Sequence, residues 1–127
     1  MTKIRSAAKH ENLEAWQVSV DLAIRVIKAT QGFPREERYA LASQMRRAAV
    51  SVPSNLAEGN GLSSRRAFAN GVAIARGSLN ELRTQMVIAK RCGWLTDSQA
   101  VELMALADSV GRLLNGLYRS LALPRKD

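Results

Sequence analysis

Apolar residues recur along this chain at alternating intervals of three and four, which is the period of an α-helix with one buried face. Four such stretches are separated by short segments that contain Gly, Pro or Ser. Short connections place consecutive helices side by side and antiparallel. The pattern therefore predicts an all-α protein, an antiparallel up-down-up-down four-helix bundle.

The first two helices are predicted over about 12–30 and from Pro34 onwards. Gly32 is expected to cap the end of the first, and the fixed φ angle of Pro34 suits the first turn of the second. Pro53 lacks a backbone donor inside the second pattern, so we expect a kink there, with helix resuming to about residue 58. The predicted buried stripes are Leu13, Trp16, Val20, Ala23 and Ile27, then Leu41, Met45, Ala48 and Val52.

The third helix has the most regular repeat in the chain. Residues 59–61 are predicted to break the chain before it, Ser63 or Ser64 to cap it, and Gly93 to end it. Its seam is Phe68, Val72, Ala75, Leu79, Leu82, Met86 and Ala89, spaced as in a left-handed bundle. Small residues predict close packing of the second and third helices; they are Ala48, Ala49, Ser51, Gly71, Ala75, Gly77 and Ser78.

The fourth helix opens at residues 96–99, where a threonine is followed three positions later by a glutamine, the form of a capping box. Its expected stripe is Leu103, Leu106, Val110, Leu113, Leu117 and Leu121. Pro124 ends the pattern. We expect a flexible basic arm over 1–11, one bundle domain over 12–123 and a short tail over 124–127, which suits the size of a single domain.

Charge adds a hypothesis about partners. The chain has 19 Lys and Arg against 11 Asp and Glu, a formal net charge of +8. This balance favours polyanionic partners, because phosphate contacts release bound counterions.

The single cysteine, Cys92, and the lack of an apolar leader predict a cytoplasmic protein. No run approaches the roughly 18 apolar residues of a membrane span, so no membrane partner is expected.

The sequence predicts no metal and no other cofactor. Bundles with di-iron sites use Glu-x-x-His pairs on two helices, whereas this chain has one histidine, His10, in the predicted arm. Cys92 has no second ligand at metal-site spacing and no histidine base near it in the sequence. We therefore interpret Cys92 as structural.

Polar residues form a second stripe beside the apolar seam of the second helix, and the third helix repeats it. The positions are Gln44, Arg47, Ser51, Asn55 and Glu58, then Ser78 and Glu81. One interpretation is a hydrogen-bonded network at a helix or subunit junction, since buried polar groups must be paired. The other is an acid/base pair of Glu58 and Glu81, which would have to converge in one accessible pocket. Arginines nearby in helical projection would form ion pairs with both, so we favour the network and expect no enzyme.

Basic residues occupy further positions of the same two helices. They are Arg46, Arg65, Arg66, Arg76, Arg83, Lys90 and Arg91. The planar guanidinium group matches phosphate oxygens, so these side chains are predicted to follow a nucleic-acid backbone. Aromatic residues that could stack on bases are few, and base-specific readout is not indicated.

Two blocks of the sequence form a pattern that generic bundles lack. The first is FPREE at 33–37 followed by QMRRAAVSVPSNLAEG at 44–59, and the second is ARGSLNEL at 75–82 ending in GWL at 93–95. The pattern resembles the four-helix-bundle family named after the 23S ribosomal RNA intervening-sequence protein, the S23-type proteins. The resemblance implies a ring-shaped homopentamer, in which Arg47, Asn55, Glu58, Ser78 and Glu81 would determine the fold or the interface.

The resemblance extends to accessory variability determinant proteins of diversity-generating retroelements, which bind a reverse transcriptase and nucleic acid through a basic surface. Our first hypothesis is a non-enzymatic, oligomeric protein that binds the phosphate backbone of RNA or DNA through an arginine-rich surface. The alternative is a protein-interaction scaffold or accessory subunit of a reverse transcriptase, without direct nucleic-acid binding.

Overall fold

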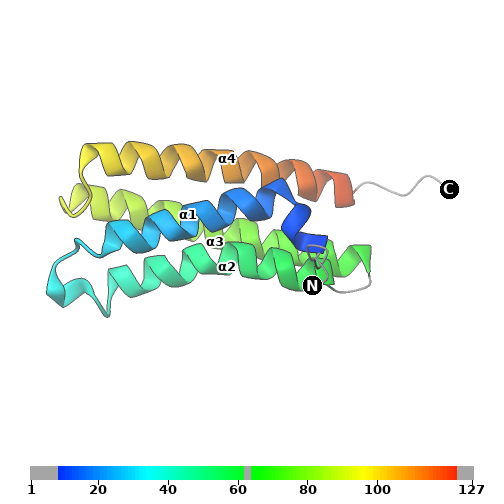
Figure 1. The fold of residues 1–127 in the computed structure, drawn as a ribbon, viewed down its shortest axis with the longest axis horizontal. Helices are drawn as coiled ribbons and strands as arrows, with labels where there is room; N and C mark the ends of the chain where they lie inside the picture. The colour runs from blue at the N-terminus through cyan, green and yellow to red at the C-terminus, as the bar shows by residue number, and fades with distance from the viewer. Residues whose placement is uncertain (1–8, 62–63, 123–127) are drawn as a thin grey trace, which may run out of the picture.

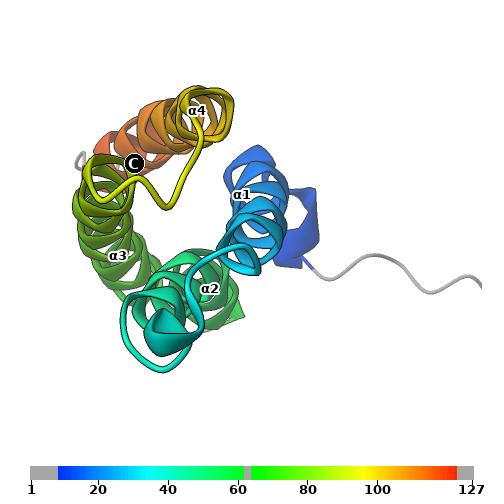
Figure 2. The ribbon, with the colours of Figure 1, turned by 90° about the vertical axis from the view of Figure 1, so that its left-hand side faces the viewer.

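The computed structural model describes residues 9–61 and 64–122. Its elements are η1 (Lys9–Asn12), α1 (Glu14–Thr30), η2 (Arg35–Glu37), α2 (Leu41–Gly61), α3 (Arg65–Arg91) and α4 (Asp97–Ala122), where η marks a 3-10 helix. No strand occurs in these two described ranges. Each α-helix runs antiparallel to the one before it (Figure 1), and seen from one end the helices stand around a common axis in the order α1, α2, α3, α4 (Figure 2). The predicted four-helix bundle is confirmed.

Both ends of α3 follow the sequence prediction. The Ser64 hydroxyl accepts a hydrogen bond of 2.9 Å from the backbone N–H of Ala67 and so caps the helix. Gly93, just beyond the other end, has a φ of 79°, which a residue with a side chain rarely adopts. The alternative cap, Ser63, lies outside the described residues.

The start of α4 is held by the predicted capping box. The backbone N–H of Gln99 donates to the Thr96 hydroxyl at 3.0 Å, and the backbone N–H of Thr96 donates to the Gln99 side chain at 2.9 Å. Phe33 and Trp94, from the two connections at this end of the bundle, pack with ring centroids 5.8 Å apart. The two connections therefore close this end of the core together.

The connection between α1 and α2 differs from the prediction. Pro34 precedes η2, and α2 begins only at Leu41. The intervening residues make tight bonds such as that from the Arg38 N–H to the Arg35 carbonyl, 3.2 Å, which is the 3-10 pattern. Gly32 does not take a positive φ angle, so it does not act as the predicted left-handed cap.

Helix α2 continues past Pro53, where we expected a kink, and ends at Gly61 instead of near residue 58. Pro53 is buried, and the side chains that follow it bond to backbone carbonyls of the preceding turn. Ser54 Oγ donates to the Val50 carbonyl and Asn55 Nδ2 to the Ser51 carbonyl, both at 2.8 Å. These bonds supplement the backbone ladder where proline removes one donor.

The predicted arm also ends earlier than expected, because residues 9–11 belong to η1. The His10 ring meets the Trp16 ring edge-on at a centroid distance of 5.2 Å, and Gln17 Nε2 donates to the Glu11 carbonyl at 2.9 Å. These contacts attach η1 to the first turn of α1. Residues 1–8 of the arm and the predicted tail lie outside the described residues.

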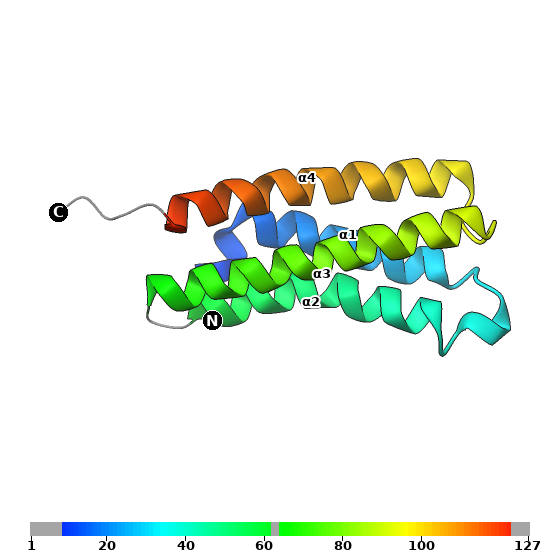
Figure 3. The same ribbon diagram turned by 180° about the vertical axis from the view of Figure 1, so that it is seen from behind.

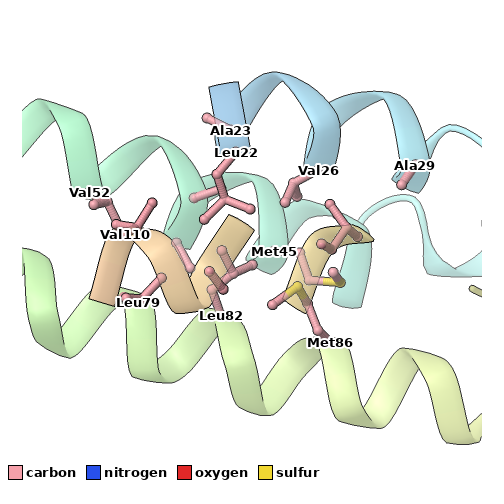
Figure 4. Close-up of a cluster of buried hydrophobic side chains, with 14 of the residues drawn as sticks. Leu22, Ala23, Val26, Ala29, Met45, Val52, Leu79, Leu82, Met86 and Val110 are labelled. Atoms are coloured by element: carbon pink, nitrogen blue, oxygen red, sulfur yellow. The ribbon is translucent and has the colours of Figure 1, made fainter. Parts of the chain in front are cut away.

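The core is aliphatic and fills the space between all four helices (Figure 4). The predicted stripe of α2 is buried except for Leu41, which packs at its edge. On α3 the predicted seam is buried from Val72 to Ala89, with Phe68 packed against it. Both stripes are confirmed, and they line the two sides of one continuous interface.

The stripes predicted for α1 and α4 are partly wrong. The residues of α1 that are buried are Ala15, Ser19, Leu22, Ala23, Val26, Ala29 and Thr30, and those of α4 are Leu103, Ala107, Val110 and Leu114. The larger Trp16, Leu106 and Leu113 are only partly buried at the edges of the core. Small residues face the axis because they let the helices approach, and long side chains cover the seams between them.

The closest approach in the bundle brings Gly59 of α2 against Gly71 of α3. A Cβ on Gly71 would lie 2.7 Å from the Asn55 carbonyl oxygen and 3.1 Å from Gly59 Cα. Residues 59–61, predicted to break the chain, are instead the last turn of α2, where glycine permits helix contact. The predicted close packing of these two helices is confirmed.

We predict that Gly71→Ala destabilises the protein by about 1–3 kcal/mol, because its methyl group collides with backbone atoms that cannot rotate away. Gly77→Ala, in the same helix with nothing within 4 Å of the added Cβ, is the matched control. It should stabilise the fold by about 0.5–1 kcal/mol through helix propensity. Urea unfolding followed by circular dichroism measures both, and equal stabilities of the two variants would contradict the close approach.

Candidate functional site

Three of the seven predicted phosphate contacts bond instead to a neighbouring helix, and Arg46 is the first. Its Nε donates to the buried Thr30 hydroxyl at 2.8 Å and its Nη2 to the Ile27 carbonyl at 3.4 Å. Arg46 therefore joins α2 to the last turn of α1, where a positive charge favourably meets the carbonyl end of the helix dipole.

Arg83 and Lys90 join α3 to α4 through carboxylates. Arg83 Nη1 lies 2.7 Å from Asp108 Oδ1, and its Nη2 donates to the Ala107 carbonyl at 3.2 Å. Lys90 Nζ lies 2.9 Å from Asp97 Oδ1. Each pair cancels the charge of its cation locally, so neither cation adds much to a basic surface.

Three further cations of α3, Arg65, Arg66 and Arg76, belong to its N-terminal half, which lies beside the C-terminal half of α4 (Figure 3). Arg65 Nη2 donates to the Ser120 carbonyl at 2.5 Å, and the Arg76 guanidinium carbon lies 4.7 Å above the centre of the Tyr118 ring. Arg66 is exposed. These interactions place three of the seven predicted residues on one side of the bundle.

Acidic residues are absent from two neighbouring segments of these helices. Residues 64–80 and 115–122 contain four arginines and no Asp or Glu. We refer to the four, Arg65, Arg66, Arg76 and Arg119, as the basic α3–α4 surface. Arg65 donates to a backbone carbonyl and Arg76 lies over an aromatic ring.

A groove of about 610 Å³ lies within the basic α3–α4 surface. Its polar lining includes Arg66 and Asn70 of α3, and Tyr118 of α4 forms part of its wall. The rest of the α3 side is mostly alanine, at positions 67, 69 and 73. Small side chains thus leave a depression between an arginine and an aromatic ring.

Arg91, the last predicted phosphate contact, is exposed at the far end of α3 from Arg66. A 27-residue helix is about 40 Å long, so these two arginines do not share a binding site within one chain. The structure therefore brings together only part of the predicted set.

The residues of the predicted polar stripe lie close together more completely than the predicted basic residues do. The Ser51 and Ser78 hydroxyls lie 2.8 Å apart, and Asn55 Nδ2 donates to Ser51 Oγ at 2.9 Å. A groove of about 410 Å³ between α2 and α3 is lined by Gln44, Arg47, Ala48, Ser51, Ser78 and Glu81. Six of the seven predicted residues thus belong to one groove or to the hydrogen bonds at its base.

Glu58 is the exception, and its position argues against an acid/base pair. Ser51 packs opposite Ser78 and Gly59 opposite Gly71, so Glu58 lies near residue 71 and far from Glu81. The two carboxylates are about ten residues apart along the pair, roughly 15 Å. They do not converge on one pocket.

The groove between α1 and α4, about 530 Å³, has charges of both signs. Arg25 Nη1 lies 2.5 Å from Glu102 Oε1, with Asp21 and Lys28 also in the lining. This face therefore has no net basic character.

Across residues 9–61 and 64–122, no group of three or more His, Cys, Asp or Glu side chains is placed to hold a metal ion. In the same ranges no helix is long and apolar enough to cross a membrane.

Sequence reasoning missed Tyr118 and Arg119 as members of the basic α3–α4 surface. The signal was present, because two acid-free stretches, 64–80 and 115–122, belong to helices that an antiparallel bundle places side by side. Gln85 repeats the polar spacing of Ser78 and Glu81 on α3 but was not among the seven residues of the predicted network. It is buried, and its Oε1 has no hydrogen-bond partner among the described residues.

A family model described as 23S rRNA-intervening sequence protein matches residues 11–116. This chain belongs to that family. A solved structure from the S23 ribosomal protein family, a protein of unknown function from Bacteroides thetaiotaomicron, superposes with a TM-score of 0.76. It is 21% identical, and the match covers 83% of this chain and 95% of the other. A search of curated proteins gives no match. The comparisons establish the family and the fold.

The Lys90 and Asp97 contact gives a prediction about acidity. The hydrogen bond and positive charge of Lys90 hold the pKa of Asp97 below its ordinary value. Because folding lowers this pKa, the contact contributes stability above the ordinary range and loses it as the pH falls through the folded pKa. Lys90→Met should raise the pKa of Asp97, measured by NMR titration of its carboxyl carbon. Arg119→Met, near the other end of α4, should leave it unchanged, and an unchanged pKa in Lys90→Met would contradict the contact.

Proposed function

We propose that this protein is a non-enzymatic homo-oligomer that binds nucleic-acid phosphates through the basic α3–α4 surface. The observation that carries the proposal is the pair of acid-free segments, 64–80 and 115–122, with four arginines on neighbouring helices. Elsewhere on the bundle, cations such as Arg25, Arg83 and Lys90 are paired with carboxylates. The two acid-free segments thus place four positive charges on neighbouring helices with no acidic residue between them in either segment.

Arginine suits this task because its planar fork presents several donors to phosphate oxygens. Arg66 stands in the first turn of α3, where the backbone N–H groups and the helix dipole also favour an anion. Phosphate contacts of this kind depend on charge and spacing and are shared by all sequences. The surface is therefore proposed to bind without strong sequence preference.

We further propose that the oligomer is a homopentamer formed through the outer α2–α3 face. Ile74, 46% exposed, lies on the same face of α3 as Gly71 and Ser78, both of which contact α2. Beside it are the hydroxyl pair and the buried Gln85 oxygen without a partner in the described ranges. The basic α3–α4 surfaces of two copies would repel each other, which leaves them open to an anionic ligand.

The nucleic-acid proposal predicts the effect of removing two exposed arginines. Arg66→Gln combined with Arg119→Gln should weaken binding of a short mixed-sequence RNA at least about tenfold near 100 mM salt and flatten the salt dependence. These two are chosen because Arg65 and Arg76 contact α4, so that replacing them could also disturb the fold. Fluorescence anisotropy between about 50 and 200 mM salt measures both quantities.

The matched control replaces the exposed Arg35 and Arg38, at the opposite end of the bundle, by glutamine. It removes the same two charges, from +8 to +6, and should reduce binding much less. Equal losses in the two double variants would show that only net charge matters and would contradict a defined surface. Failure of the unaltered protein to bind RNA at low salt would overturn the proposed function and favour docking of a protein.

The oligomer proposal predicts a mass of five times 13.9 kDa, about 70 kDa, in light scattering. Ile74→Arg should reduce this mass, because a charge would be buried in each interface. Ile24→Arg is the matched control, since Ile24 is 45% exposed and lines the α1–α4 groove. A monomeric native protein, or equal effects of the two substitutions, would contradict the assigned face.

A further inference from the structure

We propose that the groove beside Tyr118 holds one unpaired nucleobase, with a neighbouring phosphate at Arg66, so that the protein prefers single-stranded nucleic acid. This inference rests on the proposed function and specifies the ligand of that surface. An unpaired base on a phosphate backbone is common to single-stranded RNA and DNA. Four features of the molecule support it: the ring, the space beside it, the polar groups around it and the lack of a comparable site at other aromatic residues.

The Tyr118 ring is fixed in orientation and partly exposed. The Arg76 guanidinium lies over it at 4.7 Å, and the ring is half-buried against α3. A base can stack on an aromatic ring, and Tyr118 is the lining residue of the groove that offers one. A pre-oriented platform lowers the entropic cost of ordering the ligand.

The groove beside the ring is large enough for a base and its sugar. At about 610 Å³ it falls within the usual range of small-ligand sites, about 300–1,000 Å³. Three of its lining residues are alanines of α3, whose methyl groups give a flat apolar surface. Larger side chains at these positions would fill the space into which a base can insert.

The polar groups of the groove suit the rest of a nucleotide. Asn70 offers a carbonyl acceptor and two amide donors, which match the edge of any base. Arg66 lines the same groove one turn before Asn70 and stands at the N-terminus of α3. A phosphate attached to the inserted base thus meets a guanidinium group and the positive end of a helix.

Other aromatic residues lack this combination. Trp16 packs on His10, and Trp94 packs on Phe33. Tyr39 is 87% exposed, but the two arginines next to it in the sequence, at 35 and 38, are balanced by two glutamates at 36 and 37. Phe33 lines a groove together with Arg38 and Arg46, but its side chain is buried. Tyr118 is only partly buried and lines a groove beside two segments without acidic residues.

A base inside a duplex is stacked and paired, so it cannot reach Tyr118 without being extruded, which costs free energy. Single strands present bases that are free to insert. We therefore expect the oligomer to bind single-stranded RNA and single-stranded DNA at least about fivefold more tightly than a duplex of the same length and salt concentration. Binding of only one of the two single strands also supports the groove and identifies the sugar that it accepts.

Tyr118→Leu keeps apolar volume but removes the ring, and it should weaken single-strand binding about fivefold or more while leaving duplex binding unchanged. Tyr118→Phe keeps the stacking surface and should bind within about twofold of the native protein. The salt dependence should not change in Tyr118→Leu, because stacking releases no counterions. Circular dichroism checks that each variant is folded.

A strand that contains one 2-aminopurine reports insertion directly. Its fluorescence should fall on binding to the native protein and to Tyr118→Phe, and should fall less with Tyr118→Leu. Equal affinities for duplex and single strands, together with no loss in Tyr118→Leu, would overturn this inference and leave the proposed phosphate binding intact. Absence of all nucleic-acid binding by the native protein would overturn the proposed function itself.

Discussion

The fold depends on the contact between Gly59 and Gly71, where α2 and α3 come closer than any side chain would allow. This approach fixes the register of the two helices, and the register then brings Ser51 opposite Ser78. With the register fixed, the apolar seams of α2 and α3 face each other and the polar stripe falls at their outer edge. A one-turn shift would separate the Ser51 and Ser78 hydroxyls and bring residues with side chains to the place where Gly59 and Gly71 meet.

Helix α3 also organises the other side of the bundle through its arginines. Arg65, Arg76 and Arg83 reach α4 at successive levels and meet a carbonyl, an aromatic ring and a carboxylate. Their alkyl stems can cover the seam while the charged heads remain at the surface. The same residue type therefore stabilises the α3–α4 contact and sets the charge of its outer face.

Much of the fold could be predicted from the sequence because its signals are local. The heptad of α3, the cap at Ser64 and the capping box at Thr96 each depend on residues within one or two turns. The stripe of α1 could not be assigned in the same way, because Trp16 and the buried Ser19 exchange the roles that hydropathy gives them. Which face turns inward there depends on how closely the neighbouring helices approach, and that distance is not encoded within α1.

The candidate site, too, has residues whose arrangement could be predicted from the sequence and residues whose arrangement could not. The polar stripe was predictable, since its spacing along two helices is a local property. The arginines were not, because their roles depend on partners far away in the sequence: Arg46 reaches residues 27 and 30, and Arg83 reaches 107 and 108. The net charge of the sequence includes all of these cations equally. The structure shows which of them form ion pairs with carboxylates and which contact a carbonyl or an aromatic ring instead.

That separation explains why the basic character is concentrated around Tyr118. Asp97 and Asp108 are near Lys90 and Arg83 and cancel their fields within a few ångströms. A carbonyl or an aromatic ring orients a guanidinium group by its partial charges and leaves the net charge in place. Arg76 is oriented in this second way, and Arg65 also donates to a carbonyl. The start of α3 thus combines oriented cations with a segment that has no acidic residue of its own, which favours holding an anionic backbone in a defined position.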